Sequence, residues 1–131
     1  VLCNIISTQP IHSQYGGVVP ELASRAHEKN IIPVVNEAFE KSGINKKSIN
    51  AVAFTQGPGL LGSLLVGSCF AKSFSLALSV PLIGVNHMEA HIFAHFIEKP
   101  IPEFPFLCLT VSGGHTQIIL VEGFDKLTVL G

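Results

Sequence analysis

Apolar residues along this chain fall into short continuous runs and longer segments, and the two kinds alternate. Runs at residues 1–6, 51–55 and 82–85 predict buried strands, because short continuous apolar runs are typical of strands covered on both faces. The longer segments 18–42 and 60–78 predict helices. Since helices alternate with strands, the sequence predicts an α/β layer with parallel pairing in part.

The first predicted helix carries start and stop signals. Pro20 lies near its first turn, where a missing N–H costs little, and Gly43 supplies a C-terminal stop. Leu22 and Ala26 share one face whereas Ile32, Val35 and Phe39 share another, and this change of phase predicts a kink or break at Pro33. Glu21 and Arg25 are expected to pair on the helix surface as i,i+4 neighbours.

Two apolar runs near the end of the chain, 106–111 and 115–121, predict a hairpin. They are separated by residues 112–114, a Ser-Gly-Gly turn sequence. The proline-rich run 99–105 ends the helix that precedes them. The sequence therefore adds an antiparallel pair to the α/β layer.

Composition supports one globular domain. The chain has 131 residues, of which 47% are hydrophobic and 13% charged, and this argues against disorder and predicts a sizeable core. We therefore expect residues 1–131 to form a single partial domain. The net charge of -1 gives no basic footprint for nucleic acid, so any RNA contact would need help from elsewhere.

The longest apolar stretch, residues 59–80, raises the question of a membrane. Lys72 and several serines interrupt it and predicted strands flank it, so we expect a buried helix and no membrane contact. Three widely spaced cysteines (Cys3, Cys69 and Cys108) without a CxxC pair favour a reducing cytoplasm over a disulfide framework or a cysteine zinc site. The chain opens without Met on an apolar run, and we expect it to be a fragment.

Two histidines four residues apart, His87 and His91, follow a predicted strand. On a helix they project about 40° apart, so both imidazoles can reach one metal ion. The dipole at a helix N-terminus favours the neutral imidazole that binds metal. An ordinary pair of surface or core histidines is the alternative, and two ligands do not complete a site.

A zincin protease is a rival hypothesis for this helix. Its motif is His-Glu-x-x-His, and here Met88 occupies the place of the glutamate. Glu89 lies two residues from each histidine and therefore points to the far side of the helix, away from a shared ion. His95 drifts a further turn from the pair, and we leave it outside the site.

Two glycine-rich turns could present backbone amides to an anion. The segment 57–62 precedes the second helix but lacks the Gly-Lys-Ser/Thr of a Walker loop. Ser63, Gly67 and Ala71 continue from it as a stripe of small residues, suited either to tight internal packing or to a partner surface. The segment 112–116 offers glycine amides, hydroxyls and an imidazole, as a phosphate or adenylate site or as a plain hairpin turn. A serine hydrolase is discounted, because no Gly-x-Ser-x-Gly is present.

Four motifs taken together resemble one enzyme family. In chain order they are Y-G-G-V-V-P-E-L-A-S-R-A-H, G-P-G-L-L-G-S-L-L-V-G, N-H-M-E-A-H and F-P-F-L-C-L-T-V-S-G-G-H-T-Q. The chain is similar in them to the tRNA N6-adenosine threonylcarbamoyltransferases, formerly called O-sialoglycoprotein endopeptidases. The resemblance implies an actin-like, sugar-kinase-like ATPase fold, of which this chain would be a partial N-terminal lobe with a mixed sheet.

The resemblance also implies an activity and its partners. The activity is transfer of threonylcarbamoyl from threonylcarbamoyl-adenylate to N6 of adenosine 37 in tRNAs that read codons beginning with A. The partners are tRNA, a smaller paralogue and an accessory ATPase. The alternatives are a metal-dependent glycoprotein endopeptidase and a purely structural ATPase-fold partner, which would be expected to lack the paired histidines.

Site residues follow from the resemblance residue by residue. His87 and His91 would be two ligands of one iron or zinc ion, and Thr110, Val111, Ser112, Gly113 and Gly114 would contact the adenylate. The first strands, the aspartate that completes the metal site and most of the nucleotide pocket expected in the intact protein have no counterpart in this chain. The chain alone should therefore bind metal weakly and be inactive.

Overall fold

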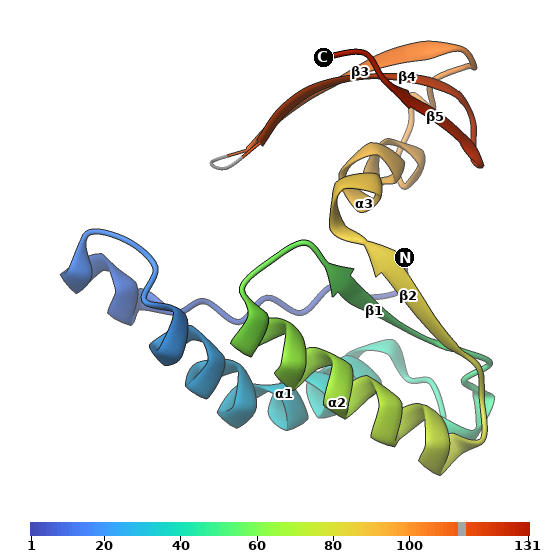
Figure 1. Cartoon of the computed structure of the whole chain (residues 1–131). Helices are drawn as coiled ribbons and strands as arrows, with labels where there is room; N and C mark the ends of the chain where they lie inside the picture. The colour runs from blue at the N-terminus through green and yellow to red at the C-terminus, as the bar shows by residue number, and fades with distance from the viewer. Residues whose placement is uncertain (113–114) are drawn as a thin grey trace. The chain divides into compact units, whose positions relative to one another are not determined.

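The structure is a computed structural model in which residues 1–112 and 115–131 are described (Figure 1). Contacts between residues divide the chain into two compact units, Val1–Asn86 and His87–Gly131. The single partial domain expected from the sequence stays a prediction. The first unit is an α/β assembly, and the second packs a helix on a sheet, so each unit has its own strands.

The first unit, Val1–Asn86, combines two long helices with a pair of parallel strands. The helices are α1 (Pro20–Ser42) and α2 (Leu61–Leu78), and the strands are β1 (Val52–Gly57) and β2 (Leu82–Asn86). Short 3-10 turns cover Pro10–Tyr15 and Lys46–Ser48. Helix α2 contacts both α1 and β1, and Figure 1 shows the two helices side by side along the strands. The predicted parallel pairing is confirmed.

Helix α1 begins and ends as its sequence predicts. Pro20 lies in its first turn, and Gly43 caps it with φ 67° while its N–H donates to the Phe39 carbonyl at 3.0 Å. Of the kink or break expected at Pro33, the break is wrong, because α1 runs on through this residue, and the kink stays a prediction. Proline costs this helix one backbone hydrogen bond, and contacts with α2 at both ends of α1 offset that loss. Near the start of α1, Ser24 packs against Gly62, and near its end the Phe39 ring lies 6.1 Å from the Phe74 ring.

Two ion pairs lie on the exposed side of α1. Glu21 and Arg25 form the predicted i,i+4 pair at 2.7 Å, and Glu37 and Lys41 form a second at 2.6 Å. The hydrogen bond and the negative charge of Glu37 raise the pKa of Lys41 above its ordinary value. Both pairs are solvent-exposed, so they add little to the stability of the fold.

The opening strand expected at residues 1–6 is wrong, because these residues have no regular structure. Instead the Cys3 thiol donates to the Ala38 carbonyl of α1 at 3.4 Å. Leu2 and Ile5 line an apolar cavity of about 870 Å³ with α1, α2 and β1. A strand needs a neighbouring strand for its backbone groups, and the sheet of this unit contains β1 and β2 alone among the described residues.

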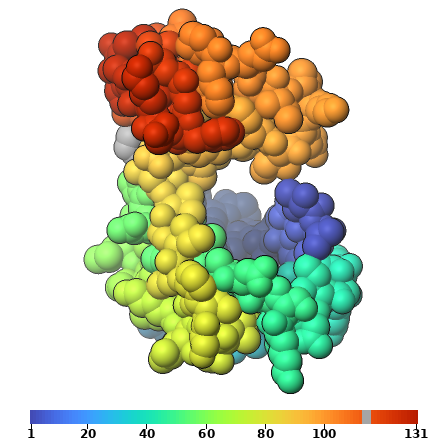
Figure 2. Space-filling model, turned by 90° about the vertical axis from the view of Figure 1, so that its right-hand side faces the viewer, coloured from blue at the N-terminus to red at the C-terminus, as the bar shows by residue number. Residues whose placement is uncertain are grey.

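Helix α2 buries one side and exposes the other. Ala71 and Ser75 are buried, whereas Leu61, Leu65 and Leu76 are exposed, so the expected buried helix is found only in part. The end of α2 and strand β2 form an open surface, yellow-green to yellow in Figure 2. By length and a mean hydropathy of 1.5, α2 is the one helix of the described residues that could cross a membrane, which is weak evidence because soluble core helices pass the same test.

The second unit, His87–Gly131, packs a short helix on an antiparallel sheet. Helix α3 (His87–Phe93) continues into a 3-10 turn, Ala94–Phe96. The sheet has the order β3–β4–β5, with β3 at Phe106–Ser112, β4 at His115–Gly123 and β5 at Lys126–Val129. The predicted hairpin is confirmed, and β5 extends it.

The core of the second unit lies between α3 and one face of the sheet. Ile92 of α3 packs with Cys108, Ile119 and Val121, all of them buried. Five phenylalanines extend this core with ring centroids 5.0 to 6.3 Å apart, namely Phe93, Phe96, Phe104, Phe106 and Phe124. On the other face of the sheet, Leu107, Leu109 and Val111 alternate with the buried residues and are exposed. Both faces of β3 are therefore apolar.

The glycines of α2 differ in the room around them, and this predicts opposite effects of the same substitution. A Cβ added at Gly67 meets nothing within 4 Å, so Gly67→Ala should raise the free energy of unfolding by about 0.5–1 kcal/mol through helix propensity. A Cβ added at Gly62 would lie 3.1 Å from the Ser24 Cβ, so Gly62→Ala should not stabilise. Urea unfolding of both variants checks this, and a Gly67→Ala variant less stable than Gly62→Ala would contradict it.

Candidate functional site

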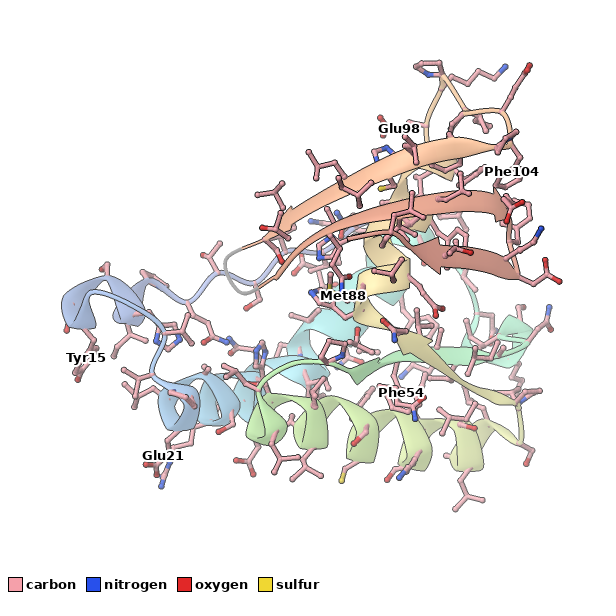
Figure 3. All side chains as sticks on the ribbon, turned by 45° about the horizontal axis from the view of Figure 1, so that its top comes forward. Tyr15, Glu21, Phe54, Met88, Glu98 and Phe104 are labelled. Carbon is pink, nitrogen blue, oxygen red and sulfur yellow. The ribbon has the colours of Figure 1, made fainter. Side chains whose placement is uncertain are left out.

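The candidate site is built on α3, which the sheet of the second unit holds in place. Ile92 is 1% exposed against β3 and β4, and Met88, one turn earlier and labelled in Figure 3, is half-buried. His87 and His91 share the neighbouring face of the helix and are exposed. Burial of one face of α3 therefore leaves both imidazoles accessible from solvent.

The two imidazoles lie close enough to bind one ion. Their Nε2 atoms are 3.2 Å apart, and the ring centroids are 4.5 Å apart with the ring planes at 64°. Two nitrogens bound to one tetrahedral zinc ion at 2.0–2.1 Å would lie about 3.3 Å apart. The pair thus has the spacing of two metal ligands, and without metal the same spacing allows one Nε2–H to donate to the other Nε2.

The pair stands alone as a donor set in the described part of the chain. Among residues 1–112 and 115–131, no group of three histidine, cysteine, aspartate or glutamate side chains is placed to hold a metal. Structural and catalytic zinc sites use at least three protein ligands. Metal binding at His87 and His91 stays a prediction, and a full site would need at least one further ligand.

The predicted adenylate contacts lie at the end of β3 and divide between the two faces of the sheet. Thr110 is 7% exposed, and its hydroxyl lies 4.0 Å from the Cys108 thiol on the face that packs against α3. Val111 is 71% exposed on the opposite face, and Ser112 returns to the face of Thr110. Gly113 and Gly114 lie outside the described residues. Of the described contacts, Thr110 and Ser112 thus share the side of the sheet that carries the histidine helix.

The glycine-rich segment 57–62 forms a turn before α2 and continues into α2, where the stripe of small residues begins. Gly57 has φ 152°, a conformation that favours glycine over other residues. In the stripe of small residues, Ala71 is buried and Gly67 lines the cavity of the first unit, while the buried Ser63 hydroxyl has no hydrogen-bond partner in the described structure. The stripe faces inward, as internal packing predicts.

A hydrogen-bonded chain that the sequence did not reveal joins the Pro10–Tyr15 turn to α1. The Val19 N–H donates to His12 Nδ1 at 3.4 Å, so His12 carries its proton on Nε2 and donates to Gln9 Oε1 at 2.8 Å. Gln9 Nε2 then lies 3.4 Å from His27 Nε2 and 3.5 Å from the Ala23 carbonyl. Gln9 and His12 are three residues apart, but Ala23 and His27 lie 14 and 18 residues from Gln9 and follow no recognised spacing, so only the fold could show these contacts.

Comparison with known proteins identifies relatives along the whole chain. Residues 1–131 match the family described as tRNA N6-adenosine threonylcarbamoyltransferase. Two curated proteins of that name, from Christiangramia forsetii and Phocaeicola vulgatus, are 60% and 57% identical over 100% of this chain. The chain spans 39% and 40% of the length of these two relatives.

A solved structure shares the fold at low sequence identity. YeaZ from Pseudomonas aeruginosa superposes with a TM-score of 0.57 and 16% identity, covering 82% of this chain and 50% of that chain. The likeness agrees with the predicted class, a partial α/β lobe. The actin-like type stays a prediction. The parallel and antiparallel pairings of the expected mixed sheet occur in two separate sheets.

The spacing of the two imidazoles predicts a weak metal site in the isolated chain. Zinc titration monitored by calorimetry should show one weak site. His87→Ala or His91→Ala should each lower the zinc affinity. Because each removes a direct ligand, the loss should exceed the roughly tenfold to hundredfold that follows removal of a residue that only supports a ligand. His95→Ala removes an exposed histidine just beyond α3 and should leave the titration unchanged. Tight binding by the unsubstituted chain, or equal loss in His95→Ala, would contradict the two-ligand site.

Proposed function

Because the chain belongs to the tRNA N6-adenosine threonylcarbamoyltransferase family, we propose that the intact protein transfers threonylcarbamoyl from its adenylate to N6 of adenosine 37 in tRNAs reading codons that begin with A. The observation that carries the proposal is identity of 60% across the whole chain with a relative of that name. The chain spans 39% of that relative, so the activity belongs to the longer protein, and this chain alone should be inactive.

The reaction is an acyl transfer. The N6 nitrogen of adenosine forms a bond to the carbamoyl carbon, the bond from that carbon to the phosphate oxygen breaks, and AMP leaves while N6 loses a proton. Thr110, Val111, Ser112, Gly113 and Gly114 are proposed to contact the adenylate. We assign no residue of this chain as the general base.

His87 and His91 are proposed to hold one iron or zinc ion, and their 3.2 Å spacing supports this role. Such an ion supplies Lewis-acid polarisation of a substrate carbonyl and fixes substrate orientation. Exposure of both imidazoles leaves room for ligands from outside this chain and from the substrate. An ATP or nucleotide site is proposed for the intact protein.

The glycoprotein endopeptidase reading is not favoured. A zincin helix places a glutamate directly after its first histidine so that the carboxylate can act on a metal-bound water. Met88 stands at that position and is half-buried. The named relatives are transferases.

The proposed partners are tRNA, a smaller paralogue and an accessory ATPase, in a reducing cytoplasm. For the paralogue we favour the outer side of α2 over the inward stripe of small residues. Exposed apolar residues recur along this outer side at Leu61, Leu65, Cys69 and Leu76. The three free cysteines fit a reducing compartment.

The transferase proposal predicts a metal-dependent assay result. With partner proteins, tRNA and threonylcarbamoyl-adenylate, the intact protein should modify adenosine 37, and His87→Ala plus His91→Ala should lower the rate by at least about a hundredfold. His95→Ala is the matched control and should keep the rate of the unsubstituted protein. Absence of transfer by folded, metal-loaded protein would reject the function, whereas cleavage of a glycoprotein by it would support the endopeptidase.

The partner surface predicts a contrast between the two sides of α2. Leu65→Lys places a charge in the exposed apolar stripe and should weaken binding of the paralogue by about tenfold. Gly67→Ala adds a methyl group toward the internal cavity and should leave binding unchanged. Light scattering or calorimetry with the two purified proteins measures both. The opposite order of effects would return the interface to the stripe of small residues.

A further inference from the structure

The Pro10–Tyr15 turn lies beside the start of α1 and is held there mainly by hydrogen bonds (Figure 1). None of the residues Pro10–Tyr15 is buried, so burial of apolar surface contributes little to its position. Gly16 and Gly17 connect the turn to the residues before α1, and Gly16 has φ 67°. Two successive glycines let the backbone pivot at this point. The hydrogen bonds between the turn and α1 therefore decide whether the turn stays docked.

The imidazole of His12 makes the main contact, and it has to be neutral to do so. The Val19 N–H, directly before α1, donates to His12 Nδ1 at 3.4 Å. Because a backbone N–H can only donate, this nitrogen carries no proton, and Nε2–H donates to Gln9 Oε1 at 2.8 Å. An imidazolium has an N–H on both ring nitrogens. Protonation of the half-buried His12 would therefore set two N–H groups against each other.

The same constraint passes through Gln9 to His27. Since Gln9 Oε1 accepts from His12, its Nε2 faces the Ala23 carbonyl at 3.5 Å and His27 Nε2 at 3.4 Å. The amide can donate to His27 Nε2 only if that nitrogen carries no proton. A flipped Gln9 amide could accept from a protonated His27, but its NH2 group would then meet the Nε2–H of His12. The docked arrangement therefore requires both imidazoles to be neutral.

The charged groups around the two histidines offer an imidazolium no compensation. Residues 1–19 contain no Asp, Glu, Lys or Arg, and their titratable groups besides His12 are the N-terminal amine, Cys3 and Tyr15. Among residues 1–112 and 115–131, no carboxylate forms an ion pair with either histidine. The positive end of the α1 dipole also opposes a cation at His12, which bonds the residue before the helix.

The surroundings of His27 on the two helices are uncharged as well. Glu21 and Arg25 of α1 pair with each other at 2.7 Å, and Glu28 and Lys29 follow His27 directly and so project from other faces of the helix. The first turn of α2, whose residues line the same cavity as His27, has no charged residue. The uncharged residues about one turn from His27 along α1 are Ala23, Ser24, Asn30 and Ile31.

We propose that the Pro10–Tyr15 turn is a pH-sensitive strap, which neutral His12 and His27 fasten to the start of α1 and which their protonation releases. The docked state binds fewer protons than the released state. By linkage, docking is complete at the upper end of the histidine titration range and is lost as the pH falls through it. The released turn pivots at Gly16 and Gly17. This device is independent of the reaction that the intact protein catalyses.

Three substitutions separate titration from hydrogen bonding. Asparagine in His12→Asn offers Oδ1 to the Val19 N–H in place of Nδ1 but does not titrate. Glutamine in His27→Gln likewise offers an oxygen to the Gln9 amide without titrating. His12→Leu removes the acceptor altogether. The double variant with His12→Asn and His27→Gln therefore keeps the docking contacts and loses the proton-binding groups.

The test is hydrogen–deuterium exchange of the intact protein, with rates corrected for intrinsic exchange at each pH. Protection of the Val19 amide should fall by about threefold to tenfold between about pH 8 and about pH 5, the worth of one hydrogen bond. His12→Leu should show the low protection at both pH values, and the double variant should keep the high protection at both. The Gly43 N–H, which donates to the Phe39 carbonyl at the other end of α1, is the control and should not change.

Three outcomes would overturn the strap. One is protection of Val19 that does not depend on pH in the unsubstituted protein. Another is an equal fall in the double variant, since that protein lacks both imidazoles. The third is a parallel fall at Gly43, because the whole helix would then be opening and not the turn. Exchange needs no substrate, so the result stands whether or not the transferase proposal holds.

Discussion

Burial of Ile92 is the contact on which the candidate site depends. Helix α3 has seven residues, too few to be stable by its own hydrogen bonds. Ile92 inserts among Cys108, Ile119 and Val121, and the phenylalanine cluster ties the following turn to the same sheet. Core packing in the second unit thus holds together the helix whose period brings the imidazoles close to each other. The same sheet orients Thr110 toward this core and Val111 away from it.

Much of the fold could be predicted from the sequence where the proline and glycine signals at element ends agree with the apolar pattern. Pro20 and Gly43 bound α1, and the alternation around residues 112–114 predicts the hairpin of β3 and β4. The prediction failed where tertiary contacts override a local signal. Pro33 does not break α1, because the helix packs on α2 at both ends, and residues 1–6 stay irregular because no described strand pairs with them. Strand β5 was missed because its four residues carry too short an apolar pattern.

The candidate site, too, could be predicted from the sequence only in part. Spacing alone predicts that His87 and His91 share a helix face, since the helical period fixes it. Which side of α2 is open, by contrast, depends on where α1 and β1 lie, and the sequence allowed both answers for the stripe at Gly67. The hydrogen-bonded chain of Gln9, His12 and His27 joins residues from separate segments. No local pattern carries that information, so only the structure could show it.

The apolar residues on the open face of β3 also govern how this polypeptide behaves in a test tube. Leu107, Leu109 and Val111 present adjoining aliphatic side chains to water, next to Ile118 of β4. The free energy falls when such a surface is covered by anything apolar, whether a detergent tail, a fluorescent hydrophobic dye or the same surface on another molecule. Residues 1–131 alone should therefore self-associate through this face or bind detergent and dye there, and protein concentration determines the extent of self-association as much as sequence does.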